Sequence, residues 1–190
     1  MRTFVLFAIL LFTCALSHGQ NKRYRFIGLM PGGFLEIEAP YYPIERFTIN
    51  VIPLVFEIPI NTVTDFKFAT IGMYEYGDQP RLSVVGGQLV FPRYFRAKER
   101  YSEKSSGWYL GPFISGSRDF YRNLYSVSPG LELGKIFEDK RSFALSINLQ
   151  AGGTYQFRMN RKNAIVPFVG INLGFGFWIK QKLFVRGGSV

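Results

Sequence analysis

The sequence predicts an all-β fold, an antiparallel up-and-down transmembrane β-barrel of about eight strands. Its clearest sign is the alternation of apolar with small or polar residues from Phe143 to Thr154, because a period of two places alternate side chains on opposite faces of a strand. Composition agrees, with 20 Phe, 11 Tyr and 20 Gly among 190 residues and only 19% charged residues, against roughly 25% in soluble domains. Most strand-like segments also reach the roughly 9–11 residues that a membrane-crossing strand needs.

The expected strands follow one another from about residue 46 to the C-terminus. The alternation changes phase near Pro53 and again around Gly86 and Gly87, and the first of these changes predicts a β-bulge. Prolines inside other segments are expected at bulges or strand ends, since proline cannot donate a hydrogen bond to the sheet. The eight segments cover residues 46–60, 65–76, 81–95, 107–117, 124–137, 142–157, 165–178 and about 182–190.

The fifth, sixth and seventh segments each have one apolar face and one face of small or polar residues. We expect the apolar face to point to lipid and the other face to line the lumen, where glycines let a narrow barrel close around its larger side chains. The alternative is a soluble periplasmic or secreted lipocalin-like barrel that binds an apolar ligand, and such a barrel should carry charged residues outward on every strand. The predicted lipid-facing residues are Tyr125, Val127, Pro129, Leu131, Leu133, Phe143, Leu145, Ile147, Leu149, Ala151, Ile165, Pro167, Val169, Ile171, Leu173 and Phe175.

The second segment carries aromatic residues near both of its ends. Phe66 and Phe68 lie near one end, Tyr74 and Tyr76 lie near the other, and all four share a face. This spacing suits two aromatic girdles, one at each membrane surface. The general preference of aromatic residues for strands explains it equally well, so both interpretations stay open.

The N-terminus has the pattern of an export signal. Residues 1–19 combine the positive charge of Arg2, a short apolar run and small residues near the end, so we expect a signal peptide that is cleaved after Gly19. A spanning helix is less favoured because the apolar run is shorter than roughly 20 residues, and lipidation of Cys14 is a further alternative. Residues 20–43 are expected to form an N-terminal arm, with a lumen plug or an extra hairpin as alternatives, and residues 44–190 the barrel.

Cleavage after Gly19 has a chemical consequence. The single cysteine and the single histidine, Cys14 and His18, both leave with the signal. The mature chain would then have no disulfide, no thiol nucleophile, no zinc site of the Cys/His type and no histidine base. We therefore predict no catalytic residue, no metal ligand and no cofactor, and the chain is not expected to be an enzyme.

The one candidate site is a cluster of charges in the lumen. Glu132 lies in the middle of a regular strand on the predicted lumen face, where an unpaired charge is costly. Lys67 and Arg93 are the candidate partners across the lumen. A structural ion pair or a hydrogen-bonded plug is the favoured interpretation, and a solvated pore lining is the alternative. Because an eight-stranded lumen is narrow and filled, a wide diffusion channel is not expected.

The net charge of +10 indicates anionic partners. For an exported chain these are the phosphate-bearing lipids of a membrane, lipopolysaccharide among them, rather than nucleic acid. Many charges fall in the longest connection, residues 96–106, which is either a mobile charged loop or a contact site. Counting from a first strand that begins in the periplasm places this loop outside the cell.

Three stretches carry a resemblance to a known group of proteins. They are Ser17-His18-Gly19-Gln20 at the end of the export signal, Gly107-Trp108-Tyr109-Leu110-Gly111-Pro112-Phe113, and the Gly-rich alternation of residues 165–178. From about residue 44 onward the chain resembles small outer-membrane β-barrel proteins of Bacteroidetes-type bacteria. The resemblance implies a Gram-negative outer-membrane protein inserted by the barrel-assembly machinery, which reads a final strand that usually ends in an aromatic residue, where this chain has Val190.

The resulting expectation is a non-enzymatic outer-membrane barrel with a structural or surface-binding role. The soluble lipocalin-like barrel is the first alternative. A lipid-modifying outer-membrane enzyme is the second, although the serine chemistry of such enzymes uses a histidine base that the mature chain would lack.

Overall fold

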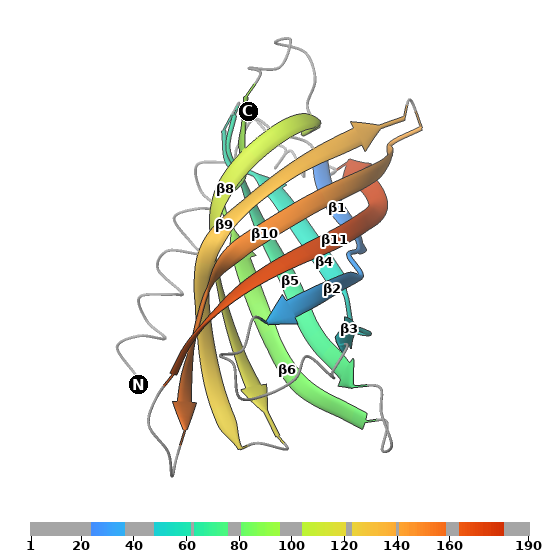
Figure 1. Cartoon of the computed structure of the whole chain (residues 1–190). Helices are drawn as coiled ribbons and strands as arrows, with labels where there is room; N and C mark the ends of the chain where they lie inside the picture. Colours follow the sequence, from blue (N-terminus) through green and yellow to red (C-terminus); the bar gives the residue numbers. More distant parts are fainter. Residues whose placement is uncertain are drawn as a thin grey trace, which may run out of the picture.

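The computed structural model describes residues 24–36, 48–61, 63–75, 81–95, 104–120, 123–139, 141–158 and 164–180. These residues form eleven β-strands of one antiparallel sheet, whose tilted strands wrap around a common axis (Figure 1). No helix in this part of the chain is long and apolar enough to cross a membrane. The strands are β1 (Tyr24–Leu29), β2 (Gly32–Glu36), β3 (Thr48–Asn50), β4 (Leu54–Pro59), β5 (Asp65–Glu75), β6 (Arg81–Val90), β7 (Arg93–Tyr94), β8 (Gly107–Asp119), β9 (Leu124–Glu138), β10 (Phe143–Arg158) and β11 (Ala164–Lys180).

Three pairs of short strands are halves of longer strands. β1 and β2 both pair with β11 in one register, with Tyr24 opposite Lys180 and Glu36 opposite Phe168. In the same way β3 and β4 share β5 as a neighbour, and β6 and β7 share β8. The sheet therefore has eight wall strands, and the pairing of β1 and β2 with β11 closes it. The predicted eight-stranded antiparallel barrel is confirmed.

The first and last wall strands differ from the expected ones. β1 and β2 form the first wall strand, so residues 24–36 belong to the barrel and not to the arm that was expected over residues 20–43. With this additional strand at the start, the eighth wall strand is β11 and not a segment that begins near residue 182. The expected signal peptide of residues 1–19 and the segment 182–190 lie outside the described residues.

A β-bulge interrupts the second wall strand between β3 and β4. Asn50 pairs with Met73 and Val55 with Ala69, so the four residues 51–54 face the three residues 70–72. The Asn50 side chain fills the gap, because its Oδ1 accepts a hydrogen bond from the backbone N–H of Gly72 at 2.9 Å. The bulge predicted near Pro53 is confirmed.

A second irregularity lies in β6, three residues before Gly86, where the sequence predicted a change of phase. Met73 pairs with Val84 while Tyr74 pairs with Leu82, which leaves Ser83 as the extra residue. From that point onward the even-numbered residues of β6 and β7 point into the barrel. A shift of one residue exchanges the two faces of a strand, so this position decides which side chains of β6 and β7 reach the lumen.

The barrel has two distinct ends. At the first, called here the Tyr24 end, β1 begins and β11 finishes, and the connections β4–β5, β7–β8 and β9–β10 lie there. At the other, the Asp119 end, β8 turns into β9 and β10 into β11. Residues 96–103 of the longest predicted connection lie outside the described residues. The flanking strands β7 and β8 have their adjoining ends at the Tyr24 end, where the first wall strand also begins. The strand count behind the predicted extracellular loop therefore changes by one.

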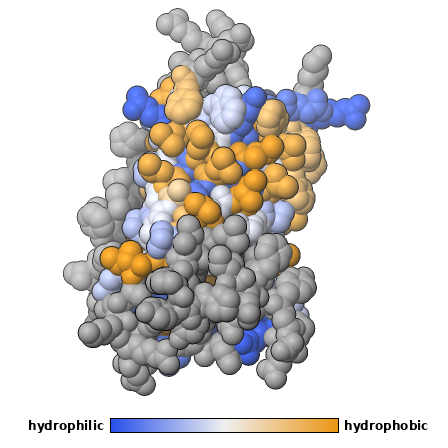
Figure 2. Space-filling model, in the orientation of Figure 1, coloured by the Kyte–Doolittle hydropathy of each residue, from blue (hydrophilic) through white to orange (hydrophobic). Residues whose placement is uncertain are grey.

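The faces of the strands are inverted relative to a soluble protein. The described residues include fifteen buried polar or charged residues and thirty large hydrophobic residues on the outside. The alternation predicted for β9, β10 and β11 is confirmed, with Leu131, Leu149 and Ile171 more than half exposed and Glu132, Asn148 and Asn172 buried. Figure 2 shows the apolar side chains gathered on the outer face of the barrel.

Candidate functional site: an apolar outer wall around a filled polar lumen

Aromatic side chains gather near both ends of the outer wall. At the Tyr24 end Phe143 and Phe177 meet edge to face at 5.5 Å between ring centroids, and at the Asp119 end Tyr155 and Phe157 meet at 4.7 Å. The aromatic pattern of the second predicted segment thus extends around the barrel, although Tyr76 lies outside the described residues. The outward aromatic residues near the Tyr24 end include Phe66, Phe91, Phe95, Trp108, Phe137, Phe143 and Phe177, and those near the Asp119 end include Tyr74, Phe120, Tyr125, Tyr155 and Phe157. Phe56, Phe68 and Phe175 also face outward.

The separation of the two aromatic girdles matches a bilayer. Phe143 and Tyr155 lie 12 positions apart on β10 (155 − 143), and Tyr125 and Phe137 lie 12 apart on β9. At about 3.3 Å per residue this is about 40 Å along the strand, and a tilt of about 40° reduces it to about 30 Å along the barrel axis. The hydrocarbon core of a bilayer is also about 30 Å thick.

The lumen holds an ion pair between a lysine on β5 and a glutamate on β9. The Lys67 ammonium on β5 lies against Oε1 of Glu132 on β9, and the two side chains are 3% and 0% exposed. Gln150 on β10 donates to the second carboxylate oxygen, Oε2, at 2.5 Å, and also lies 3.2 Å from Oε1 of Gln88. Both carboxylate oxygens therefore have donors, as a buried carboxylate requires.

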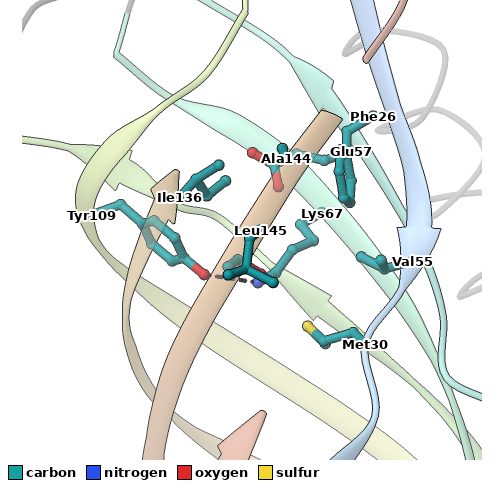
Figure 3. Close-up of a pocket in the computed structure, with 10 residues that line it drawn as sticks. Phe26, Met30, Val55, Glu57, Lys67, Tyr109, Ile136, Ala144 and Leu145 are labelled. Atoms are coloured by element: carbon teal, nitrogen blue, oxygen red, sulfur yellow. Dashed lines mark hydrogen bonds between the residues drawn. The ribbon is translucent and has the colours of Figure 1, made fainter. Parts of the chain in front are cut away.

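Tyr109 connects this ion pair to the rest of the lumen. Lys67 donates to the Tyr109 hydroxyl at 3.0 Å, and that hydroxyl donates to Oε1 of Glu132 at 2.6 Å; Figure 3 shows Lys67 and Tyr109 pointing toward one another. The side-chain amide of Asn148 lies 2.6 Å from the same hydroxyl. The Asn148 atom at that distance is Oδ1, an acceptor, so Glu132 and Asn148 share the single proton of the Tyr109 hydroxyl. The Asn148 nitrogen donates instead to Sδ of Met30 at 3.3 Å.

A second buried carboxylate lies beside the first pair. Glu57 on β4 is directly opposite Lys67 on β5 and is 2% exposed. Tyr94 donates its hydroxyl to Oε1 of Glu57 at 2.6 Å, and the Tyr94 ring lies 5.3 Å from the Tyr109 ring. The two tyrosines thus join the two carboxylates into one polar cluster, with Lys67 between them.

Glycines make room for these large side chains. A Cβ atom added at Gly134 would overlap the Tyr109 ring, and it would lie only 2.6 Å from Oδ1 of Asn148. At Gly176 it would lie 2.7 Å from the ring of Phe26. Gly134 and Gly176, two of the lumen glycines predicted from the alternation, therefore lie against aromatic rings in the narrow interior.

The lumen around the ion pair is filled. The cavity beside it has a volume of about 10 Å³ and is lined by Lys67, Glu57, Tyr109 and apolar neighbours that include Phe26 and Met30 (Figure 3). About 10–15 Å³ is the least that holds one water molecule. No group of three or more His, Cys, Asp or Glu side chains that could hold a metal ion occurs among the described residues.

The three candidate lumen residues do not all meet. The structure brings Glu132 and Lys67 together, although 65 positions separate them in the chain. Arg93 on β7 is exposed on the outer face, since the irregularity at Ser83 turns the odd-numbered residues of this strand outward. Sequence reasoning missed Tyr109 and Glu57; both lie on inward-facing positions of alternating segments, which is the signal that could have found them.

No protein-family model matches the chain, and no curated protein sequence matches it. Among solved structures, the chain is similar to the solid-state NMR structure of the outer membrane protein AlkL in DMPC lipid bilayers. That similarity has a TM-score of 0.47 and 11% sequence identity, and it covers 87% of this chain and 94% of AlkL. A similarity of this size does not identify a function for this chain.

The fold and the surface define a transmembrane β-barrel. The barrel is closed, and its outer wall is apolar between two aromatic girdles. Among the described residues its filled interior combines fifteen buried polar or charged residues with fifteen buried hydrophobic ones. A soluble barrel that binds an apolar ligand would need the opposite distribution, an apolar interior with space for the ligand and a charged exterior.

Proposed function

We propose that the chain is an integral outer-membrane β-barrel protein of a Gram-negative bacterium with a structural or surface-binding role and no enzymatic activity. The observation that supports this most is the set of thirty exposed large hydrophobic side chains around an interior that holds fifteen buried polar or charged residues. Monomeric soluble proteins rarely expose apolar patches of more than a few hundred Å². In an outer membrane these side chains contact lipid, and closure of the sheet lets neighbouring wall strands pair their backbone groups with one another.

The filled lumen supports a role that does not depend on passage through the barrel. Lys67, Glu132 and Tyr109 cross the interior, and the cavity beside them holds at most about one water molecule. Binding would then fall to the loops, the rims and the outer wall. The outer-membrane lipids, lipopolysaccharide included, and the barrel-assembly machinery remain the partners that we propose.

Fractionation and gel mobility test this function. The mature protein should be recovered with the outer membrane, and the unheated sample should migrate faster than the boiled sample because the barrel resists detergent. Recovery in the soluble periplasmic fraction would contradict the proposal. The purified protein should also give no steady conductance in a planar bilayer, since a stable open pore would show that the lumen is not filled.

The lipid-modifying enzyme stays an alternative that a separate experiment tests. Lipid analysis of cells with and without the gene should show no change in acylation if the role is structural or binding. A lipid species that disappears with the gene, and returns when the gene is restored, would favour the enzyme.

A further inference from the structure

We propose that the outer wall at the Tyr24 end holds a binding site for the phosphate of an anionic phospholipid headgroup, formed by Arg93 and Lys135 over an aromatic floor. The proposal rests on the proposed membrane location. It adds a ligand class and two binding residues, one of which was expected in the lumen.

The two cations lie on neighbouring parts of one wall. Arg93 on β7 is opposite Leu110 on β8, which is opposite Leu133 on β9. Lys135 lies two positions beyond Leu133, nearer the Tyr24 end. Two strand spacings of about 4.8 Å and two residues of about 3.3 Å put the Cα atoms of the cations about 12 Å apart. Two long, flexible side chains can reach a common phosphate group across that distance.

Aromatic rings hold one of these cations in place. The Lys135 ammonium lies 5.2 Å from the centroid of the Trp108 ring and 4.6 Å from that of Phe137. Cation–π contacts of this kind keep an ammonium group at the wall. Phe95 joins the floor on the other side, because its backbone N–H donates to the Trp108 carbonyl at 3.0 Å. Trp108 and Phe95 are 52% and 62% exposed, so the floor itself is accessible.

Neither cation is neutralised by the protein. Within the described part of the chain, Arg93 and Lys135 have no carboxylate partner, whereas Lys104 near the same end pairs with Glu138 at 2.7 Å. The rim beside Arg93 is open and is lined by Val63, Arg93, Tyr94 and Phe95. The Arg93 side chain is exposed there, so a headgroup can reach it.

The surroundings fit a lipid better than a free phosphate ion. The residues beside Arg93 in the same register, Leu110 and Leu133, are exposed and apolar. They continue the wall toward the middle of the membrane, where acyl chains would lie against them. A headgroup phosphate bound by the cations would therefore be followed by chains on an apolar surface.

Tryptophan quenching measures this preference directly. Trp108 is outward and 52% exposed, while Trp178, the other of two tryptophans, faces the lumen and is 3% exposed. A Trp178→Phe variant leaves Trp108 as the single probe, and it loses no hydrogen bond because the Trp178 indole N–H has no partner among the described residues. If that variant fails to fold, the native protein serves, since lipid cannot reach the buried Trp178.

The folded protein is reconstituted in vesicles with either brominated phosphatidylglycerol or brominated phosphatidylcholine. Quenching of Trp108 should show about five-fold preferential association with the anionic lipid, the effect of about one interfacial cation. The double variant Arg93→Gln/Lys135→Gln should bring the ratio near one, and Lys135→Arg should keep it. The matched control is Arg25→Gln, an exposed outward cation at the same end on β1, which should leave the ratio unchanged.

Several results would overturn the proposal. Equal quenching by the two lipids would do so, as would a loss of selectivity in Arg25→Gln as large as in the double variant. Competition by inorganic phosphate would show a site for the free ion and not for a lipid. The gel-mobility shift on boiling is measured on every sample as a test of the folded barrel. If the native protein shows the shift but no preference for the anionic lipid, only this binding site is rejected. If the native protein shows no shift, the proposed membrane function is rejected as well.

Discussion

Removal of the Lys67 ammonium should destabilise the barrel strongly, and Lys67→Met is the variant that removes it with little change in side-chain length. Glu132 is 0% exposed and would keep its hydrogen bonds from Tyr109 and Gln150, but it would lose its ion-pair partner. At an ordinary ion-pair distance of about 2.8 Å, Coulomb's law gives about 6 kcal/mol at an effective dielectric constant of about 20, and about 1.5 kcal/mol in water. After desolvation is included, breaking a buried pair costs about 3–5 kcal/mol.

The assay is urea unfolding of the protein in lipid vesicles, followed by the mobility of unheated samples on gels. We expect Lys67→Met to lower the free energy of unfolding by about 3–5 kcal/mol. The double variant Lys67→Met/Glu132→Gln should lose less than the sum of the two single variants, because the remaining group no longer carries an unpaired buried charge. The matched control is Lys104→Met, whose pair with Glu138 is 16% and 17% exposed and is therefore less buried than the pair of Lys67 with Glu132. Its loss should cost less than that of the Lys67 pair.

One result would refute this reasoning. A loss in Lys67→Met that is below about 1 kcal/mol, or no greater than that in Lys104→Met, is the cost expected of a pair screened by water. The lumen would then be a solvated pore lining and not a filled interior, which was the alternative that the sequence left open for Glu132.

Three further variants test the packing of the lumen and the orientation of the wall. Gly134→Ala should lower the free energy of unfolding by about 1–3 kcal/mol, since the added methyl group overlaps the Tyr109 ring; unfolding by urea in vesicles measures it, and an unchanged midpoint would mean that the ring can move away freely. Leu149→Arg, at the midpoint between the girdle residues on β10, should cost about 2–4 kcal/mol, while Ile179→Arg at the rim should cost at most about 1 kcal/mol. Equal costs at the two depths would contradict a membrane-spanning wall.

Much of the wall could be predicted from the sequence because the strands are long and regular. β9, β10 and β11 have 15, 16 and 17 residues, and a two-residue period repeated that often separates the two faces without ambiguity. The predicted lipid-facing residues of these strands all lie on the outward face. Short interrupted strands could not be predicted in this way. β1 and β2 are broken at Met30 and Pro31, so their alternation is too short to separate a wall strand from an arm.

The candidate site could be predicted only in part. Glu132 was correctly placed in the lumen because it sits on a regular strand, and Lys67 because β5 keeps its phase from Asp65 onward. Arg93 was misplaced because a single extra residue, Ser83, reverses the faces of β6 and β7. The sequence shows a change of phase in this strand only around Gly86 and Gly87. The extra residue itself is found by pairing β6 with β5.

The sequence by itself determined that the chain is all-β, that its strands have one apolar and one polar face, and that about eight of them close into a barrel. The reason is that side-chain alternation is local and depends only on the pleat of a strand. Only the tertiary structure decided which segment is the first wall strand, which side chains meet across the lumen and which cations face outward. These depend on register and closure, which join residues as distant as Lys67 and Glu132 or Tyr24 and Lys180.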